Sequence, residues 1–407
     1  MKILIVHQNF PGQFKHLVPE LLKDAQNQLT AFTMNSFTSA DPNLRVVSYK
    51  ATKGTAKDVH PWAAETETKV IRGEAAFRAA LMLKNEGYTP DLILAHPGWG
   101  ESLFLKDVWP KAKIVIYCEF HYASEGADIG FDPEFLSKDP GEACRLRMKN
   151  VNNFLHFDIA NAGIAPTEWQ KSTFPEPFRS KIQVIHDGID TDVVKPNAKV
   201  QLQVGKHLLT RADEIITFVN RNMEPYRGYH TFMRALPKIL KARPNARVLI
   251  VGGDGVSYGA KPPAGQTWKQ IFLNEVKDEI DLSRVHFLGH LDYKVFIPIL
   301  QLSRVHVYLT YPFVLSWSLL EAMACGCAIV ASDTAPLKEA IIDQETGLLA
   351  DFFSAKDIAD QTIHLLEHPE LRESLGARAR AFAVQQYDLR QVCLPRMVDA
   401  LTKIARA

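Results

Sequence analysis

The sequence of 407 residues has little net charge, few cysteines and no long apolar run. Its 47 Lys and Arg against 46 Asp and Glu leave no basic excess of the kind that binds nucleic acid. The five cysteines are odd in number and lack zinc-ligand spacing, which indicates reduced thiols in a cytosolic protein. No segment approaches the roughly 20 apolar residues that cross a bilayer. The short apolar run at residues 3–6 predicts a first strand rather than a signal peptide.

Short apolar segments alternate with longer amphipathic ones along the whole chain, which is long enough for two domains. Predicted strands lie at residues 2–7, 91–95, 112–118, 159–162, 182–185, 214–220, 247–251, 284–288, 305–310 and 329–331. Predicted helices lie at residues 14–23, 70–86, 142–157, 230–242, 266–279, 296–303, 316–325 and 357–367. Several strands are apolar on both faces, as in a parallel sheet covered by helices. The alternation therefore predicts a doubly wound α/β fold.

Turn residues are concentrated at residues 186–197, after which the strand–helix pattern restarts. We therefore place a domain junction at residues 188–200, between domains at residues 1–190 and 200–387. The alternative is one long loop within a single large sheet. Asp190 and Asp192 could share a cation, but acidic residues are common in turns, and we expect no metal site.

Residues 313–326 follow a β-branched apolar strand and have the pattern of a turn followed by a helix. A helix that starts at the edge of a parallel sheet presents unpaired N–H groups and the positive end of its dipole to an anion. The predicted donors are the backbone N–H groups of Val314, Leu315 and Ser316. Glu321, in the first turns of the helix, can accept hydrogen bonds from sugar hydroxyls. Together these groups describe a sugar-nucleotide site.

Two arginines, Arg221 and Arg227, occupy the loop that leaves the first strand of the second half. They can converge on one diphosphate, because the planar guanidinium binds phosphate oxygens bidentately and keeps its charge. Two arginines in a loop are more often solvated surface residues. Their place at the carboxyl end of a strand, where open α/β sheets bind ligands, favours the phosphate interpretation.

The first half offers a glycine loop and two candidates for proton chemistry. Gly12, between the first strand and a helix, would let the backbone approach a phosphate or an acceptor. An ordinary βα turn is the alternative, since the three-glycine dinucleotide fingerprint is absent. Glu119 and His121 follow another strand, and a histidine there can exchange a proton with a reacting hydroxyl near neutral pH. A structural role is the alternative for His121, and it is favoured for His96.

These segments together resemble the retaining glycosyltransferases of family 4, over nearly the whole chain. The resemblance rests on the Gly12 loop and on residues 96–101, 118–121, 130–135, 221–228, 252–255, 318–326, 339 and 347–349. It implies the GT-B fold, in which two Rossmann-like domains with parallel sheets face each other across an interdomain cleft. It also implies that a C-terminal helix at residues 388–407 packs back on the first domain, and that Gly253 takes part in donor binding.

The sequence departs from the family pattern at two positions, and the second departure is mild. The family usually has two glutamates separated by seven residues, and Glu321 matches the second, which holds the nucleotide ribose. The first position is Phe313, whose side chain cannot accept a hydrogen bond from the donor sugar. The identity of that sugar is therefore left open. The family's basic pair, commonly Arg then Lys, is Arg221 then Arg227 here, so the charge is kept.

The resemblance implies a retaining, metal-independent transferase that moves a sugar from a UDP- or GDP-sugar to the hydroxyl of a glycan, glycolipid or small molecule. Such an enzyme would act in bacterial glycan or glycolipid synthesis, with the nucleotide sugar as cosubstrate and no cofactor. A non-catalytic protein that binds nucleotide sugars or glycans is the alternative, and Phe313 motivates it. An NAD-dependent oxidoreductase would require the missing glycine fingerprint.

A basic and apolar helix face suggests peripheral contact of this cytoplasmic protein with the inner membrane face. The face consists of Arg145, Arg147, Lys149, Phe154, Leu155 and Phe157. Ordinary amphipathic packing explains these residues equally well.

Overall fold

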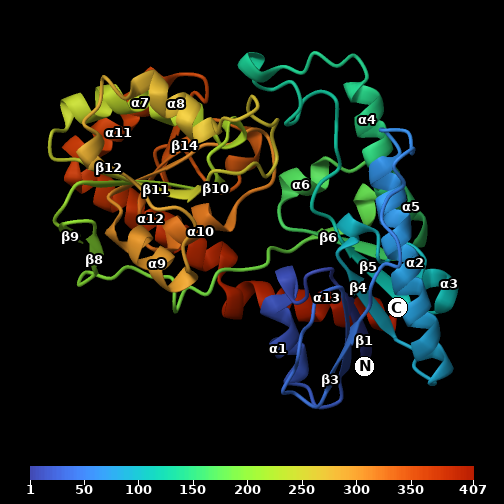
Figure 1. Ribbon diagram of the computed structural model, residues 1–407. Coiled ribbons are helices and arrows are strands. Elements are labelled where there is room, and N and C mark those ends of the chain that lie inside the picture. Colours follow the sequence, from blue (N-terminus) through green and yellow to red (C-terminus); the bar gives the residue numbers. More distant parts are fainter. The chain divides into compact units, whose positions relative to one another are not determined.

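The computed structural model describes residues 1–407, which form two compact units (Figure 1). Unit 1 comprises Met1–Ile129, Ser137–Gly188 and Arg390–Ala407. Unit 2 comprises Gly130–Leu136 and Ile189–Leu389. The chain therefore enters the main part of unit 2 at the start of the predicted junction, and its C-terminal residues return to unit 1.

Unit 1 is built on a seven-stranded parallel sheet with the order β3-β2-β1-β4-β5-β6-β7. The strands are β1 (Lys2–Val6), β2 (Gln28–Thr33), β3 (Leu44–Ser48), β4 (Leu92–Ala95), β5 (Lys113–Tyr117), β6 (Ala162–Ala165) and β7 (Ile182–Val184). In β1, residues 3–6 are completely buried, as expected for a strand covered on both faces. The strand order reverses between β1 and β4, and ligands of open α/β sheets bind at such a switch point.

Helices pack on this sheet in two groups. The long α2 (Ala64–Asn85) contacts α3 (Leu105–Val108), α4 (Glu142–Lys149) and α5 (Val151–Ile159). The other group pairs α1 (Leu17–Leu22) with the C-terminal α13 (Leu394–Arg406), which also contacts β5. Arg396 of α13 donates a hydrogen bond to the carbonyl of Val184 in β7 at 2.9 Å, so the last helix is bound to the N-terminal sheet. The short α6 (Glu168–Ser172) follows β6.

Unit 2 is built on a six-stranded parallel sheet with the order β12-β11-β10-β13-β14-β15. The strands are β10 (Ile215–Asn222), β11 (Arg247–Gly253), β12 (Val285–Phe287), β13 (Val305–Tyr308), β14 (Ala328–Ser332) and β15 (Leu348–Ala350). An antiparallel hairpin of β8 (Gln201–Val204) and β9 (His207–Thr210) precedes it. The switch point of this sheet lies between β10 and β13, so the loops after these two strands meet at one edge.

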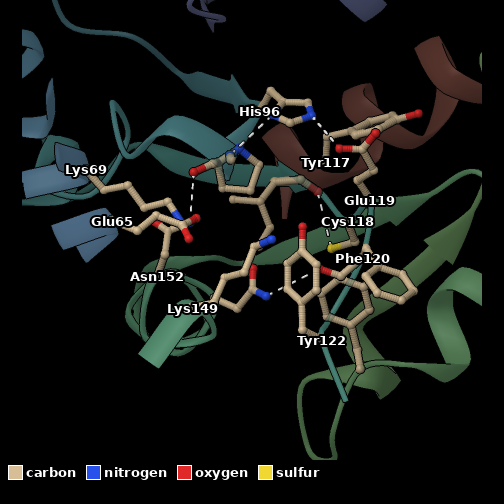
Figure 2. A pocket seen from close by; sticks show the side chains of 15 residues that line it. Glu65, Lys69, His96, Tyr117, Cys118, Glu119, Phe120, Tyr122, Lys149 and Asn152 are labelled. Atoms are coloured by element: carbon tan, nitrogen blue, oxygen red, sulfur yellow. Dashed lines mark hydrogen bonds and ion pairs between the residues drawn. The ribbon is translucent and has the colours of Figure 1, made fainter. Parts of the chain in front are cut away.

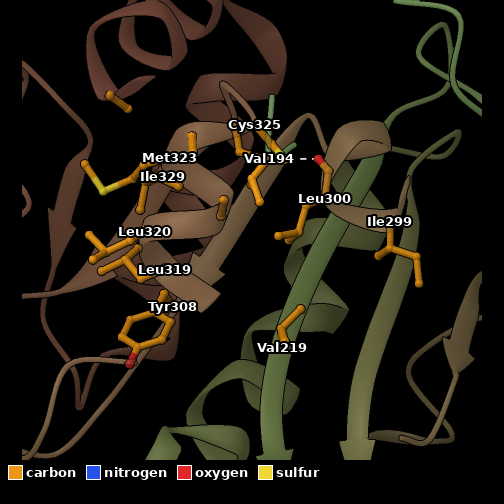
Figure 3. Close-up of a cluster of buried hydrophobic side chains, with 14 of the residues drawn as sticks. Val194, Val219, Ile299, Leu300, Tyr308, Leu319, Leu320, Met323, Cys325 and Ile329 are labelled. Atoms are coloured by element: carbon orange, nitrogen blue, oxygen red, sulfur yellow. Dashed lines mark hydrogen bonds between the residues drawn. The ribbon is translucent and has the colours of Figure 1, made fainter. Parts of the chain in front are cut away.

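Two helix layers cover the sheet of unit 2 (Figure 1). One layer contains α7 (Tyr229–Ala242), α8 (Trp268–Val276) and α11 (Ala355–Glu367). The other contains α9 (Tyr293–Leu302), α10 (Trp317–Ala324) and α12 (Pro369–Tyr387). Figure 3 shows Leu319, Leu320 and Met323 of α10 within the core beside the sheet, and none of the three side chains has any exposed surface. This burial fixes the position and direction of α10, and therefore the position of its N-terminus.

The segment Gly130–Leu136 corrects the predicted N-terminal domain at residues 1–190, because it belongs to unit 2. Asp132 is buried, accepts a hydrogen bond from the Tyr311 hydroxyl at 2.8 Å and lies 3.1 Å from Nε2 of His230. Phe131 packs against the ring of Phe353 at a centroid distance of 5.0 Å. These contacts connect residues far apart in the sequence, which is why the sequence pattern did not reveal them.

Most predicted elements occur within a few residues of their expected bounds, but one strand was displaced and several elements were missed. The strand predicted at residues 159–162 begins at Ala162, since Ile159 ends α5. The elements that were not predicted are β2, β3, β8, β9, β15, α3, α6 and α12. None of the helices combines the length and the apolar character that crossing a bilayer requires.

Candidate functional site

Arg227 is the buried centre of the site in unit 2. Its Nη1 donates hydrogen bonds to the hydroxyl of Thr310 at 2.7 Å and to the carbonyl of Val314 at 3.2 Å. The side chain is 5% exposed, and no carboxylate lies within ion-pair distance of it. A buried cation without an anionic partner keeps a positive charge that neutral hydrogen-bond partners do not balance. The arrangement is therefore that of a site for an anionic ligand.

The position of Arg227 depends on a sharp turn just before α7. Gly228 has φ +68°, and a Cβ at this position would overlap the side chain of Leu309. Glycine adopts this left-handed conformation without the steric cost that other residues pay. Gly228 thus allows the loop after β10 to lie directly against the end of β13.

The N-terminus of α10 lies in the loop that Arg227 binds. Val314 and Leu315 are buried, and the backbone N–H of Ser316 donates to the hydroxyl of Tyr308 at 3.1 Å. The Ser316 hydroxyl caps the helix by accepting a hydrogen bond from the N–H of Ser318 at 3.3 Å. Of the three backbone donors that the sequence predicted, the one at Ser316 is therefore already used within the protein.

Phe313 packs in an aromatic cluster around Arg227. Its ring lies 5.1 Å from each of the rings of Tyr226 and Tyr258, and the guanidinium of Arg227 lies 5.8 Å from it. Tyr258 contacts the same guanidinium at 5.1 Å. An aromatic face attracts a guanidinium through its quadrupole. At the position where the family has a glutamate, this chain therefore has a ring that holds Arg227 in place.

A second buried side chain shapes the loop after β11. Glu224 is completely buried, and its carboxylate accepts hydrogen bonds from the backbone N–H groups of Ser257, Tyr258 and Gly259 at 3.0 to 3.3 Å. These bonds fix the backbone at Tyr258, whose ring contacts Arg227. The carboxylate thereby orders residues 257–259 of this loop.

The remaining predicted residues of unit 2 differ in their surroundings. Arg221 lies near the end of β10 rather than in the predicted loop, and its side chain is exposed and forms no hydrogen bond or ion pair. Glu321 is buried, and its Oε1 accepts a hydrogen bond from the Tyr293 hydroxyl at 2.7 Å. At Gly253, a Cβ would overlap the ring of His290, so a larger residue does not fit.

In unit 1, His7 and Gly12 form the start of a second cluster. Nδ1 of His7 accepts a hydrogen bond from the N–H of Asn9 at 3.0 Å, which leaves the proton on Nε2 for donation to Oε1 of Gln13 at 2.6 Å. Burial and the nearby His96 lower the pKa of His7 to about 4, so the ring is neutral near pH 7. A Cβ at Gly12, where φ is +48°, would overlap this ring. His7 therefore holds the glycine loop in place rather than acting as a base.

His96 and Glu119 extend this cluster at the switch point of the sheet. The rings of His7 and His96 lie 5.4 Å apart, and Nε2 of His96 lies 3.4 Å from Oε2 of Glu119. Nδ1 of His96 accepts a hydrogen bond from the N–H of Gly98 at 3.2 Å, so Nε2 carries a proton, which faces Glu119. The structure thus brings Gly12, His96 and Glu119 together through His7. His7 was not singled out from the sequence, although its place at the end of β1, before the glycine loop, could have indicated it.

His121 lies in different surroundings from Glu119. Its ring packs against Phe154, Phe157 and Phe174 at centroid distances of 5.6 to 6.3 Å. Burial lowers the pKa of His121. The side chain is therefore part of an aromatic cluster, as in the structural alternative, and it does not line the cavity described next.

A cavity of about 80 Å³ lies beside Glu119 (Figure 2). Its walls come from the start of α2, the loops after β4 and β5, and the junction of α4 and α5. Figure 2 shows Lys69, Lys149 and Asn152 on one side of the group and Glu119 on another. The cavity thus joins the His96–Glu119 pair to Lys69 and Lys149, which are remote from it in the sequence.

Comparison with known proteins identifies the family. Residues 25–194 match the model for the Glycosyl transferase family 4 group, and residues 201–382 match the model for Glycosyl transferases group 1. The chain belongs to the family 4 glycosyltransferases and has the GT-B fold of two Rossmann-like domains. The predicted family and fold class are confirmed.

Two curated relatives and two solved structures show the extent of the similarity. The chain is 30% identical over 190 residues to D-inositol 3-phosphate glycosyltransferase of Mycolicibacterium smegmatis. The matched segment covers 46% of this chain and 41% of the relative. It is 26% identical over 263 residues to N-acetyl-alpha-D-glucosaminyl L-malate synthase of Bacillus anthracis. Here the matched segment covers 63% of this chain and 62% of the relative. The matches thus span about two to three fifths of these relatives' own length.

Among solved structures, sucrose-phosphate synthase of Thermosynechococcus elongatus superimposes with a TM-score of 0.74 and 19% identity, over 100% of both chains. HepE of Anabaena, in complex with UDP and glucose, superimposes with a TM-score of 0.67 and 18% identity, over 99% of this chain and 100% of HepE. At this level of identity the likeness shows the fold.

Proposed function

We propose that the protein is a glycosyltransferase that moves a sugar from a nucleoside diphosphate sugar to an acceptor hydroxyl with retention of anomeric configuration. The observation that carries the proposal is the buried Arg227, which lacks a carboxylate partner and is bound to the loop before α10. The family assignment supports a nucleotide-sugar donor. The structures of HepE in complex with UDP and with UDP-glucose support a UDP-sugar in particular. A GDP-sugar is the second donor class.

Arg221, Arg227 and the N-terminus of α10 would bind the diphosphate and stabilise the negative charge that develops on it. The donor's bond from C1 to the diphosphate breaks while the acceptor oxygen bonds to C1 on the same face, and the acceptor proton passes to the departing phosphate oxygen. Preorganised positive charge of this kind stabilises the transition state without reorganisation. Glu321 would hold the ribose hydroxyls, and Gly253 would allow close approach of the nucleotide.

The side chains in unit 1 would serve the acceptor. Glu119, with the Nε2–H of His96 directed toward it, can accept a hydrogen bond from the acceptor hydroxyl and orient it. His121 would act only by supporting this region, given its aromatic surroundings. No divalent metal or cofactor is part of the proposal, because the guanidinium groups supply the charge that would stabilise the leaving diphosphate.

The proposal is tested by incubating the full chain with a panel of UDP- and GDP-sugars and mixed glycan, polyol and glycolipid acceptors. We expect one donor to be consumed, and proton NMR of the product to show the anomeric configuration of the donor. Turnover is expected to persist in excess EDTA. Product with inverted configuration would contradict the retaining mechanism, and loss of turnover in EDTA that Mg²⁺ restores would contradict metal independence.

The alternative is a binding protein of the same fold, favoured by Phe313 at the usual glutamate position. It predicts tight calorimetric binding of one nucleotide sugar with neither transfer nor donor hydrolysis over the whole acceptor panel. Slow donor hydrolysis without an acceptor would count against it.

We also propose peripheral contact with anionic lipid at the inner membrane face of a cytoplasmic protein. Phe154 and Leu155 of α5 are each 48% exposed, and Arg145 and Arg147 of α4 are exposed as well. Two members of the predicted face are turned inward: Lys149 lies over the ring of Tyr122, and Phe157 stacks on Phe178 at 4.2 Å. The surface is therefore smaller than the sequence suggested.

Charge reversal of Arg145 and Arg147 to glutamate is expected to weaken binding to anionic vesicles by about tenfold or more, since each basic side chain contributes roughly 1 kcal/mol at such a surface. Co-sedimentation with vesicles of anionic and of neutral lipid measures the effect. The matched control is charge reversal of Lys111, an exposed lysine elsewhere in unit 1. Equal sedimentation of both variants and the unaltered protein would eliminate this surface as an anchor.

A further inference from the structure

The cavity beside Glu119 contains a lysine whose charge has no carboxylate partner. Nζ of Lys149 lies over the ring of Tyr122 at 3.7 Å from its centroid, and no carboxylate is within ion-pair distance of it. Burial lowers the pKa of Lys149. A cation–π contact contributes about 0.5 to 2 kcal/mol, which does not replace a full ion pair in a desolvated site. The ammonium group is therefore left with capacity for an anion.

The position of Lys149 is fixed by the residue that follows it. Asn150 is buried, accepts a hydrogen bond from the N–H of Tyr122 at 3.0 Å and donates one to the carbonyl of Tyr122 at 2.6 Å. These two bonds hold the backbone of Tyr122, and with it the ring beneath Nζ of Lys149. The cation at the cavity is thus part of a defined local structure rather than a mobile surface side chain.

Three other polar side chains line the cavity near Lys149, and they differ in the partners they have. Asn152 is buried and donates to the carbonyl of Pro97 at 3.0 Å, whereas its Oδ1 accepts no hydrogen bond. Lys69 forms an ion pair with Glu65 at 2.8 Å, and the charges of these two residues act on Lys149 in opposite directions. Glu119 faces His96 at another part of the cavity (Figure 2). The cavity therefore combines an unpaired cation, an open amide oxygen and a carboxylate beside a histidine.

We infer that the acceptor is a hydroxyl compound that carries an anionic group, a phosphate or a carboxylate, and that Lys149 binds that group. Lys149 pairs with the anion, Oδ1 of Asn152 accepts a hydrogen bond from a ligand hydroxyl, and Glu119 orients the hydroxyl that attacks the donor. The volume of about 80 Å³ accommodates such a group of a few atoms, with the rest of the acceptor outside. The inference rests on the proposed transferase function, since it concerns the acceptor of that reaction.

The test is calorimetric titration of the full chain, without donor, against matched probes. The anionic probes are inorganic phosphate, glycerol 3-phosphate and L-malate, and the uncharged counterparts of the last two are glycerol and malamide. We expect at least one anion to bind more tightly than its counterpart. Preference for the phosphates or for malate distinguishes the two anion classes.

Lys149→Gln is expected to weaken binding of the preferred anion by about tenfold or more, as for loss of one charged hydrogen bond. Lys149→Arg should restore much of the affinity, and Lys111→Gln should bind the anion as the unaltered protein does. Binding of UDP or GDP, measured in the same samples, should be the same in all variants. This nucleotide control separates failure of the inference from failure of the proposed function.

The inference is overturned if no anion binds more tightly than its uncharged counterpart, or if Lys149→Gln binds the preferred anion as tightly as the unaltered protein. If nucleotide binding persists in either case, the donor site of the proposed transferase is unaffected. If nucleotide binding is also absent from the unaltered protein, the proposed function fails independently.

Discussion

Replacing Arg221 with alanine is expected to lower kcat/KM for sugar transfer by about a hundredfold, as loss of one preorganised charge-stabilising donor does. The side chain is exposed and forms no hydrogen bond or ion pair within the protein, so its expected task is in the complex with the donor. The thermal unfolding midpoint should therefore be unchanged. Steady-state release of the nucleoside diphosphate measures the effect, and Lys277→Ala, which removes an exposed charge from the same unit, is the matched control.

Arg227→Ala is expected to lower kcat/KM by at least the same factor of about a hundred, but it also removes buried contacts. Arg227→Lys keeps the charge and loses the guanidinium group, whose Nη1 donates to Thr310 and Val314. We expect this variant to fold and to have a much lower turnover rate than the unaltered protein. Near-normal rates in both Arg221→Ala and Arg227→Lys would show that the diphosphate is bound elsewhere.

The second large effect concerns stability and its dependence on pH. Glu101 is completely buried in unit 1, and burial raises the pKa of its carboxyl group to about 7. Because the folded protein holds the proton more tightly than the unfolded chain, ionisation disfavours folding. The resulting loss of folding stability is absent below the pKa that Glu101 has in the unfolded chain. It grows as the pH rises toward about 7 and is constant above that value.

Glu101→Gln is expected to raise the free energy of unfolding by up to about 3 kcal/mol near pH 8, from a shift of roughly two and a half pKa units. Near pH 4.5 the gain should fall below about 0.5 kcal/mol, since the carboxyl group is then neutral in the folded protein and only about half ionised in the unfolded chain. Thermal unfolding at several pH values measures the difference. Glu125→Gln, at an exposed position of unit 1, should show no such pH-dependent gain. A gain that is equal at both pH values would mean that packing, not ionisation, causes it.

The fold could be predicted because its strongest signals are local. Buried strands such as β1 are apolar on both faces, and long helices such as α7 have clear periodicity. The elements that were missed are mostly short: β15 has three residues and α3 has four. Elements of this length are stabilised by neighbours that are remote in the sequence.

In the candidate site, too, the features that follow from local sequence and sheet topology could be predicted, and those that depend on remote contacts could not. Arg227 and Val314 could be paired in advance because the loops after β10 and β13 meet at the switch point of the sheet. The role of Phe313 as packing for Arg227, and the turn of Lys149 toward the cavity, depend on side-chain contacts that no sequence period encodes. His7 was missed because a single histidine at a strand end is usually structural.

The membership of Gly130–Leu136 in unit 2 has a practical consequence for dissecting the protein. A fragment that begins at Ile189 would lack Asp132, leaving the Tyr311 hydroxyl and His230 without that carboxylate and uncovering the rings that Phe131 contacts. Ribosomes also synthesise this segment long before the strands and helices that receive it. Separate expression of the two halves would therefore yield an incomplete C-terminal piece, prone to aggregate, unless the heptapeptide were supplied in trans or fused to it.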